Sequence, residues 1–389
     1  MQAPVRVLHI GKYFPPFHGG MEIFLADLVC AQANLKQHPA VLAHSSGKQT
    51  EESFTCPSGT EIPVVRAATL GRLLYAPLSP GFPWALKRML RRFRPDLLHL
   101  HLPNPSAFWA LALPETRRLP WIVHWHADAV THQVDWKVRQ AYRLYRPLEQ
   151  ALLRRSARIL ATTPPYLESS PALTPWHEKA RVVPLGLNPE RLAGKAGDAP
   201  SWPARGLRIL AVGRLSYYKG FEYLLRALSA DSRLQLILVG EGEERTRLER
   251  LADALEIRQR LLFAGALDDA RLAALMSRCD CLCLPSIDRA EAFGVVLLEA
   301  MASGKAVVVS DVPGSGMGWV VEHEVTGFKV KPASPEALAD ALRKLSDNRE
   351  MRLEMGLQGR KRFDRLFHIS AVAERIGDHY REVLSSGTF

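Results

Sequence analysis

Short apolar runs alternate with longer stretches of helical periodicity along the first half of the chain. The periodic stretches at 22–33, 84–94 and 136–157 predict helices, because their apolar residues recur every three or four positions. An alternation of strands and helices is typical of a parallel sheet covered by helices on both faces. The strands predicted here are residues 6–10, 39–43, 96–101, 121–126, 158–162 and 181–184.

The alternating pattern stops at residues 194–206 and then begins again. This segment is rich in Gly, Ala and Pro and has no periodicity, so it predicts a linker. Further strands are expected at 207–212, 234–239, 261–264, 281–284 and 306–310, and a helix at 371–384. The pattern therefore predicts an α/β chain with two doubly wound domains.

The composition is that of an ordinary soluble protein, with 389 residues, 47% hydrophobic and 23% charged. No apolar run reaches 18 residues and no signal peptide is evident, so we expect neither a membrane span nor secretion. The five cysteines form no disulfide-like framework, which fits a reducing cytosol. Cys279, Cys281 and Cys283 alternate in a predicted strand. Core packing is the preferred interpretation over a soft-metal site.

The formal net charge is +11, which implies an anionic partner such as lipid, nucleic acid or a phosphorylated substrate. Part of this charge lies on the predicted helix 84–94. Leu86, Met89, Leu90 and Phe93 share one helical face, while five basic residues lie off it. Such a helix can rest on an anionic membrane surface. The alternative is a domain helix whose charges are solvated. The five basic residues are Lys87, Arg88, Arg91, Arg92 and Arg94.

Two glutamates, Glu291 and Glu299, stand eight residues apart around the start of a predicted helix. Because a helix rises about 1.5 Å per residue, the two lie at most roughly 12 Å apart. Carboxylates accept hydrogen bonds from vicinal hydroxyls, so the pair suits a sugar and a ribose joined by a diphosphate. Phe293 and Gly294 start the helix between them, and its free N–H groups are suited to phosphate.

Two cations, Arg214 and Lys219, follow the predicted strand 207–212. Together they can neutralise a diphosphate leaving group. The alternative is two solvated loop charges. No two aspartates in the sequence are separated by a single residue, so the usual carboxylate clamp for a divalent ion is missing. We therefore expect no metal and no other cofactor.

Gly19 and Gly20 precede the first predicted helix, where glycine lets the backbone approach a phosphate group. A plain tight turn is the alternative.

Histidines gather at the ends of two predicted strands. His124, His126 and Asp128 alternate and His132 follows, so a zinc or iron site is one interpretation. His101 and Asn104 end the other strand and could reach an acceptor, as could His124; packing at the core or rim is equally compatible.

Four segments together resemble the motifs of one enzyme family. They are residues 13–22, 123–128, 212–220 and the E-x7-E segment from Glu291 to Glu299. In this order and at these gaps they resemble the retaining glycosyltransferases of the GT-B fold, in particular family 4 (glycosyl transferases group 1). The resemblance covers nearly the whole chain.

The resemblance implies a division of labour between the two domains. Residues 1–193, with the C-terminal helix 369–389 packed back on them, would bind the acceptor. Residues 207–368 would bind the nucleotide sugar, and the active site would lie in the cleft between the domains. Glu291 would contact the donor sugar, Glu299 the ribose, and His126 the reacting sugar without a metal. Gly242 and Leu267 would line the nucleotide pocket.

The expected function is transfer of a hexose, with retention, from a GDP- or UDP-linked sugar to a glycan or lipid-linked acceptor. Polysaccharide or lipopolysaccharide biosynthesis is the expected setting. The expected location is the cytoplasm, and the basic helix adds the option of a peripheral position on the inner face of the plasma membrane. One alternative is a sugar-nucleotide 2-epimerase of the same fold, which would need carboxylates placed for proton abstraction. Another is a nucleic-acid-binding protein that uses the basic helix, but that segment lacks interleaved aromatic residues, so nucleic acid is not expected as a partner.

Overall fold

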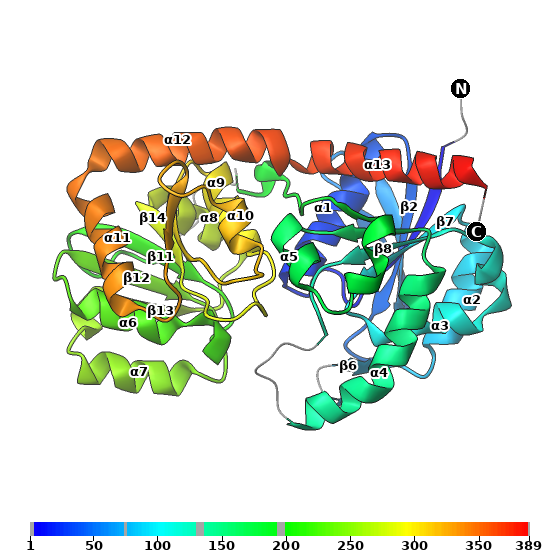
Figure 1. Cartoon of the computed structure of the whole chain (residues 1–389), viewed down its shortest axis with the longest axis horizontal. Helices are drawn as coiled ribbons and strands as arrows, with labels where there is room; N and C mark the ends of the chain where they lie inside the picture. The colour runs from blue at the N-terminus through cyan, green and yellow to red at the C-terminus, as the bar shows by residue number, and fades with distance from the viewer. Residues whose placement is uncertain (1–3, 74–75, 130–135, 193–198, 388–389) are drawn as a thin grey trace. The chain divides into compact units, whose positions relative to one another are not determined.

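The computed structural model describes residues 4–73, 76–129, 136–192 and 199–387. The chain forms two compact units, drawn in Figure 1. Unit 1 contains residues 1–186 and 369–389, and unit 2 contains residues 187–368. The predicted end of the first domain is residue 193, whereas unit 1 ends at residue 186 before it resumes at residue 369. Part of the predicted linker 194–206 and the candidate ligand His132 lie outside the described residues. The described remainder, 199–206, belongs to unit 2.

Unit 1 is built on an eight-stranded sheet in the order β10-β9-β8-β7-β1-β2-β4-β3, parallel except for β3. Its central strands β7 and β8 are buried at every residue, which requires cover on both faces and explains why they are apolar apart from their histidines. The strands are β1 (Arg6–Ile10), β2 (His38–His44), β3 (Thr50–Thr55), β4 (Glu61–Ala67), β7 (Leu97–Leu102), β8 (Trp121–Trp125), β9 (Arg158–Ala161) and β10 (Ala180–Val182).

The helices of unit 1 include one from each end of the chain. The C-terminal helix α13, red in Figure 1, packs on α1. The described helices are α1 (Gly20–Asn34), α2 (Phe82–Phe93), α3 (Trp109–Ala112), α4 (Trp136–Arg155), α5 (Pro164–Ser169) and α13 (Ile369–Ser386). The predicted strands and helices of this half are all present, with bounds that differ by at most two residues.

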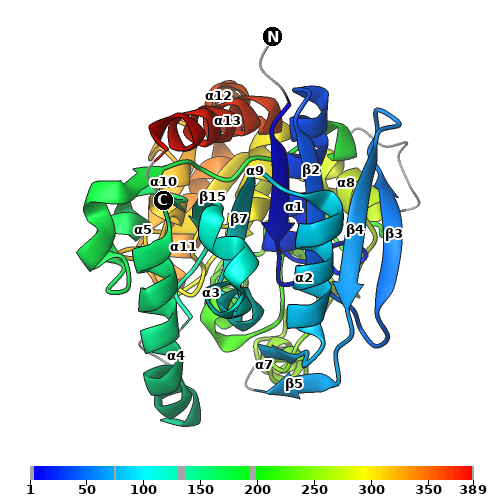
Figure 2. The ribbon, with the colours of Figure 1, turned by 90° about the vertical axis from the view of Figure 1, so that its right-hand side faces the viewer.

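Strands β3 and β4 were not predicted, nor was the hairpin of β5 (Gly71–Leu73) and β6 (Ala76–Leu78). Figure 2 shows β3 and β4 running side by side. Nearly all of β3 is exposed and its sequence is Thr-Glu-Glu-Ser-Phe-Thr, so it has no apolar run to mark it as a strand. Its pairing with β4 is a tertiary effect, which periodicity does not report.

Unit 2 is built on a six-stranded parallel sheet in the order β13-β12-β11-β14-β15-β16. Five of these strands were predicted, and β16 was missed. The strands are β11 (Leu207–Val212), β12 (Leu234–Val239), β13 (Leu261–Gly265), β14 (Cys281–Leu284), β15 (Ala306–Ser310) and β16 (Gly327–Val330). The helices are α6 (Phe221–Ser229), α7 (Arg245–Ala254), α8 (Asp269–Arg278), α9 (Val295–Ala302), α10 (Met317–Val320), α11 (Pro335–Asp347) and α12 (Arg349–Leu366).

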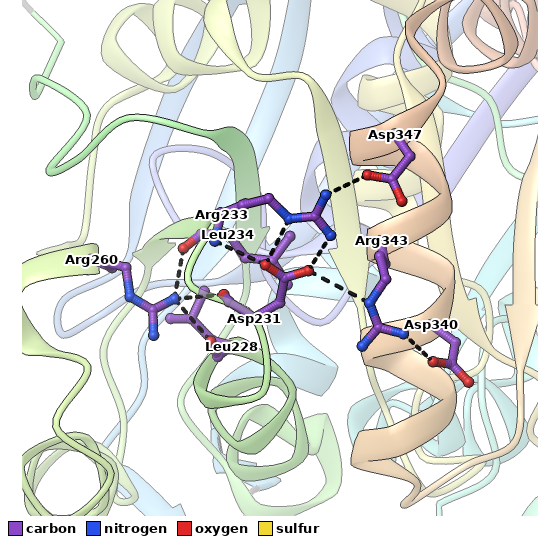
Figure 3. A network of polar contacts seen from close by, with 8 residues as sticks. All are labelled: Leu228, Asp231, Arg233, Leu234, Arg260, Asp340, Arg343 and Asp347. Atoms are coloured by element: carbon purple, nitrogen blue, oxygen red, sulfur yellow. Dashed lines mark hydrogen bonds and ion pairs between the residues drawn. The ribbon is translucent and has the colours of Figure 1, made fainter.

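A polar network fixes the loop between α6 and β12, at the edge of the unit 2 sheet where β12 begins (Figure 3). Asp231 accepts hydrogen bonds from Arg233 at 2.7–3.0 Å, and Arg233 also contacts Asp347 of α11. These bonds from Arg233 lower the pKa of Asp231 to about 2. Arg260 donates to the carbonyls of Leu228, Asp231 and Leu234. The network therefore stabilises the amino ends of the strands. Ligands of such folds bind at the opposite, carboxyl ends.

The cysteine prediction was wrong in one respect. Cys30 of α1 and Cys56, which follows β3, form a disulfide with their Cα atoms 5.5 Å apart. The two residues are separated by 26 positions and are brought together only by the packing of α1 on the missed β3–β4 pair. Cys279, Cys281 and Cys283 are free thiols buried in the core of unit 2, so their interpretation as core residues is confirmed.

Across the part of the chain that the structure describes, no helix has both the length and the apolar character that a membrane crossing requires.

Five histidines form a buried layer in unit 1. His9 belongs to β1, His99 and His101 to β7, and His124 to β8, with His126 next to the end of β8. All are at most 4% exposed, and neighbouring rings of β7 and β8 stack with centroids 4.5–5.7 Å apart. We refer to these five residues as the histidine layer. An imidazolium has no water around it there, so the layer favours neutral rings.

Burial lowers the pKa of every member of the histidine layer, that of His9 to about 4 and that of His126 to about 3. In the unfolded chain the same rings have pKa values near 6.5. Below pH 6.5 the unfolded state therefore binds protons that the folded state excludes. The layer stabilises the fold fully only above that pH, and this contribution falls as the pH drops toward 4.

We predict that unit 1 loses stability steeply between pH 6.5 and pH 4.5. Each excluded proton contributes about 1.4 kcal/mol per pH unit to the slope. Hydrogen exchange of the β7 and β8 amides, measured across this range, gives the local free energy of opening. A His99→Phe variant should show a shallower slope. An opening free energy that stays constant from pH 7 to pH 4.5 would contradict the prediction.

Candidate active site

Lys219 and Glu291 form a close ion pair in unit 2. The Lys219 ammonium contacts Oε2 of Glu291, and the two side chains are only 11% and 13% exposed. Burial acts to lower the pKa of Lys219, but the Glu291 carboxylate opposes it and the net shift is upward. Lys219 therefore carries its charge. The two residues that the sequence assigned to the diphosphate and to the donor sugar are each other's counter-ion.

Neighbouring parallel strands bring these two side chains together. Lys219 follows β11 and Glu291 follows β14, and these strands are paired, so their carboxyl ends meet at one edge of the sheet. Gly220 lies in the left-handed region at φ 65°, and a Cβ there would lie 2.2 Å from the carbonyl oxygen of Pro285. Only glycine permits this approach of the two loops. The amide of Ile287 then donates to the carbonyl of Tyr218 at 2.8 Å.

Arg214, the second predicted cation, lies at the surface. It donates two hydrogen bonds to Glu243 at 3.0 and 3.2 Å, and both side chains are more than half exposed. An exposed pair of this kind contributes at most about 1 kcal/mol, so a ligand phosphate can displace Glu243 at small cost. Gly242 allows the loop that bears Glu243 to approach, because a Cβ there would lie 2.3 Å from the carbonyl oxygen of Leu215.

Three of the predicted donor-site residues lie on or beside α9. Gly294 caps this helix at φ 78°, Phe293 is buried before it, and Glu299 is 8% exposed within it. Leu267 lies in the loop after β13 and is partly buried. Sequence reasoning missed Ser315, whose hydroxyl donates to the carbonyl of Glu291 at 2.5 Å. The sole sequence signal for it was the glycine-rich loop from Gly314 to Gly318 in which it stands.

In unit 1 the predicted phosphate contact at Gly19 and Gly20 is close to a carboxylate of the same helix. Gly19 precedes α1, and a Cβ there would lie 2.3 Å from Oε2 of Glu22. Glu22 is 8% exposed, and burial raises its pKa while nearby Lys12 acts against that. The glycine therefore makes room for Glu22 in this structure. Phosphate binding at Gly19 and Gly20 stays a prediction.

His126 and the three acceptor candidates are all buried. The backbone of His126 donates to the carbonyl of Leu102 at 3.0 Å, which fixes it beside the end of β7. His101 and His124 lie inside the histidine layer, and Asn104 is fully buried with its side-chain oxygen accepting from the amide of Ser106. This burial favours packing for His101 and His124, and the acceptor role stays a prediction for all three.

A separate pocket of about 190 Å³ lies in unit 1, beside the loop between β1 and α1 that contains Tyr13. Tyr13 and Thr69 line this pocket, and the hydroxyl of each is buried with no hydrogen-bond partner among the described residues. The Arg72 guanidinium lies 5.4 Å from the centre of the Tyr13 ring. Buried hydroxyls without partners cost free energy, so this pocket suits a ligand rich in hydrogen-bonding groups.

Comparisons with known proteins agree with this geometry. Residues 198–362 match the sequence profile described as glycosyl transferases group 1, and residues 19–186 match that of the glycosyl transferase 4-like domain. The O-antigen chain mannosyltransferase C of Escherichia coli is 28% identical over 98% of this chain and 100% of its own length. The D-rhamnosyltransferase WbpZ of Pseudomonas aeruginosa is 31% identical over 93% of this chain and 92% of its own length.

Among solved structures, the sucrose-phosphate synthase of Thermosynechococcus elongatus matches with a TM-score of 0.80 and 25% identity, over 98% of this chain and all of that one. Two parallel-sheet units, two family profiles and full-length relatives lead to one assignment. The chain belongs to the group 1 family of glycosyltransferases and has the GT-B fold.

Proposed function

We propose that this glycosyltransferase moves a hexose of the mannose or rhamnose type from a GDP- or UDP-linked donor to a glycan or lipid-linked acceptor, with retention. The names of the relatives, a mannosyltransferase of O-antigen chains and a D-rhamnosyltransferase, support this choice of sugar and of a polysaccharide acceptor. Because these relatives are transferases, they also favour transfer over the 2-epimerase alternative.

The observation that carries the proposal is the ion pair between Lys219 and Glu291. The pair is nearly buried at the carboxyl ends of β11 and β14, with Glu299 on the helix that follows. In the proposed complex the diphosphate replaces Glu291 as the counter-ion of Lys219. The carboxylate of Glu291 then accepts hydrogen bonds from sugar hydroxyls. Glu299 holds the ribose hydroxyls, and Arg214 adds a second positive charge to the phosphates.

The proposed reaction is a front-side displacement. The acceptor oxygen bonds to the anomeric carbon as the bond from that carbon to the diphosphate oxygen breaks on the same face. The acceptor hydroxyl gives its proton to a phosphate oxygen of the leaving group. Lys219 and Arg214 stabilise the charge that develops on the diphosphate, so we propose that no metal ion is required. The pocket beside Tyr13 and Arg72 is the proposed place for part of the acceptor.

We propose a location on the cytoplasmic face of a membrane, reached through the basic helix α2. The structure shows that four of its cations are paired, Arg88 and Arg92 with Glu51, and Lys87 and Arg91 with Glu115. The four side chains remain 42–73% exposed, and Trp84 on the same helix is 71% exposed. A charged surface with an exposed aromatic ring suits an anionic lipid headgroup region.

A thermal-shift panel tests the donor assignment. A ligand that binds only the folded state raises the melting temperature by mass action. We expect GDP- or UDP-linked mannose or rhamnose to raise it more than the free monosaccharide or adenosine nucleotides do. The same shift for every nucleotide sugar, or no shift for any of them, would contradict the assignment.

Glu291→Ala should abolish transfer while binding of the free nucleoside diphosphate survives. Loss of a hydrogen bond to the reacting sugar lowers the rate by about 10²-fold or more, whereas Lys219 becomes more available to phosphate. Turnover and nucleotide affinity are measured together, with the melting temperature as a check on folding. Glu243→Ala removes the exposed counter-ion of Arg214 and is the matched control. Near-normal turnover by a folded Glu291→Ala protein would contradict the proposed role.

Transfer should proceed without added metal and in excess EDTA, because Lys219 and Arg214 supply the charge that the leaving group needs. Initial rates are compared in EDTA, magnesium and manganese. Activity that disappears in EDTA and returns with a divalent ion would show that an ion handles the diphosphate instead.

Vesicle sedimentation tests the membrane contact. Each basic residue near an anionic surface contributes roughly 1 kcal/mol, so the protein should pellet with anionic vesicles at low salt and be released as salt is added. Changing Arg88, Arg91 and Arg92 to Glu should abolish pelleting. Changing Arg226, Arg250 and Arg278, three exposed arginines of unit 2, is the matched control. Equal pelleting with neutral and anionic lipid would contradict the proposal.

A further inference from the structure

Three members of the histidine layer belong to a continuous series of hydrogen bonds across unit 1, which we call the relay. Nε2 of His126 lies 2.9 Å from Nδ1 of His101, and Nε2 of His101 lies 3.0 Å from Nδ1 of His9. Nε2 of His9 lies 2.8 Å from Oε1 of Gln32 on α1. The amide nitrogen of Gln32 donates to the hydroxyl of Tyr380 on α13 at 2.9 Å. The relay therefore connects the C-terminal helix to His126.

Each hydrogen bond in the relay determines which nitrogen of the next ring carries the proton. A neutral imidazole has one N–H donor and one bare acceptor nitrogen. Oε1 of Gln32 only accepts, so His9 carries its proton on Nε2 and accepts with Nδ1. His101 must then donate from Nε2 and accept with Nδ1, and His126 must donate from Nε2. The proton of Tyr380 is left for Nδ1 of His99, 2.5 Å away.

The last acceptor of this relay is Nδ1 of His126. Nδ1 of His126 is buried, and no described residue gives it a hydrogen bond. With Nε2 protonated, this nitrogen is bare and can accept from a hydroxyl. Because burial lowers the pKa of His126, His101 and His9, the rings are neutral near pH 7 and the alternation of donors and acceptors holds. Turning the Gln32 amide over would reverse every bond, so the three tautomers change together.

We propose that His101, His9, Gln32 and Tyr380 are positioning residues that hold His126 in the tautomer with a proton on Nε2 and a bare Nδ1. That nitrogen then accepts a hydrogen bond from a hydroxyl of the sugar. This inference rests on the proposed function for its ligand, because only the resemblance places His126 beside the reacting sugar. The state of the imidazoles belongs to the protein alone and can be measured without substrate.

A metal site is the rival explanation for the same side chains. Nitrogen atoms of His101, His124 and His126 lie within 4.8 Å of one another, as do those of His9, His99 and His101. A metal binds along the in-plane lone pair of each ring, but the rings of the first trio lie within 20° of parallel, so these directions do not converge. Both nitrogens of His101 are also taken by His9 and His126. The geometry favours the relay.

The experiment measures the tautomer of His126 directly, by ¹⁵N NMR of the full chain labelled at histidine, near pH 7. His126→Gln serves only to assign the signal. We expect a protonated Nε2 and a bare Nδ1 in the wild type. Gln32→Met, which removes the direction of the relay, should give a mixture or the opposite tautomer. Tyr380→Phe, a milder change of one oxygen atom, should do the same because the Gln32 amide is then free to turn.

Gln150→Met is the matched control, because Gln150 also uses both ends of its amide in unit 1, toward Ala172 and Trp176. It should leave the tautomer of His126 and the turnover as in the wild type. Gln32→Met and Tyr380→Phe should lower the turnover by about tenfold or more with the donor KM unchanged.

A proton on Nδ1 in the wild type, an unchanged tautomer in both relay variants, or stoichiometric zinc in the purified protein would overturn the proposal. Because the NMR result needs no transfer reaction, it stands apart from any failure of the proposed function.

Discussion

The ion pair between Lys219 and Glu291 is the interaction on which the candidate site depends. It joins the loops after β11 and β14, and both charges are largely removed from water. Removal of one partner from such a pair typically costs about 3–5 kcal/mol, because the remaining charge is then buried alone. The pair holds the two loops in place in the absence of ligand. A diphosphate that binds Lys219 replaces one anion by another, so the cost of burying the ammonium is already met before the donor arrives.

Unit 1 also buries groups that can carry charge, but there they are the imidazoles of the histidine layer. Five imidazoles are packed where no water can solvate a charge, and they remain neutral because burial lowers their pKa values. Neutral rings can still form hydrogen bonds with one another if donors and acceptors alternate, as they do in the relay from Tyr380 to His126. The arrangement costs stability in acid. In return it fixes the hydrogen-bonding direction of a residue that the family resemblance places at the reaction.

The sequence predicted most of the fold because the central strands are fully buried and therefore read as mainly apolar runs, as in Cys281–Leu284 and Ala306–Ser310. It could not predict β3, whose polar residues are exposed, or the disulfide between Cys30 and Cys56 that depends on the same packing. Lys219 and Glu291 were both found from the sequence, but not their contact, since it depends on the approach that Gly220 permits. The alternation of His99 with His101 was a signal for the histidine layer, whereas Gln32 and Tyr380 carried none.

The anomeric configuration of the product is the sharpest test of the proposed glycosyl transfer with retention. The donor that gives the largest thermal shift is incubated with the enzyme and a saccharide acceptor, and the new linkage is assigned by NMR from the coupling at the anomeric carbon. We expect the same anomeric configuration as in the donor, with release of the nucleoside diphosphate. An inverted linkage, or release of the diphosphate with no new glycosidic bond to any acceptor, would contradict it.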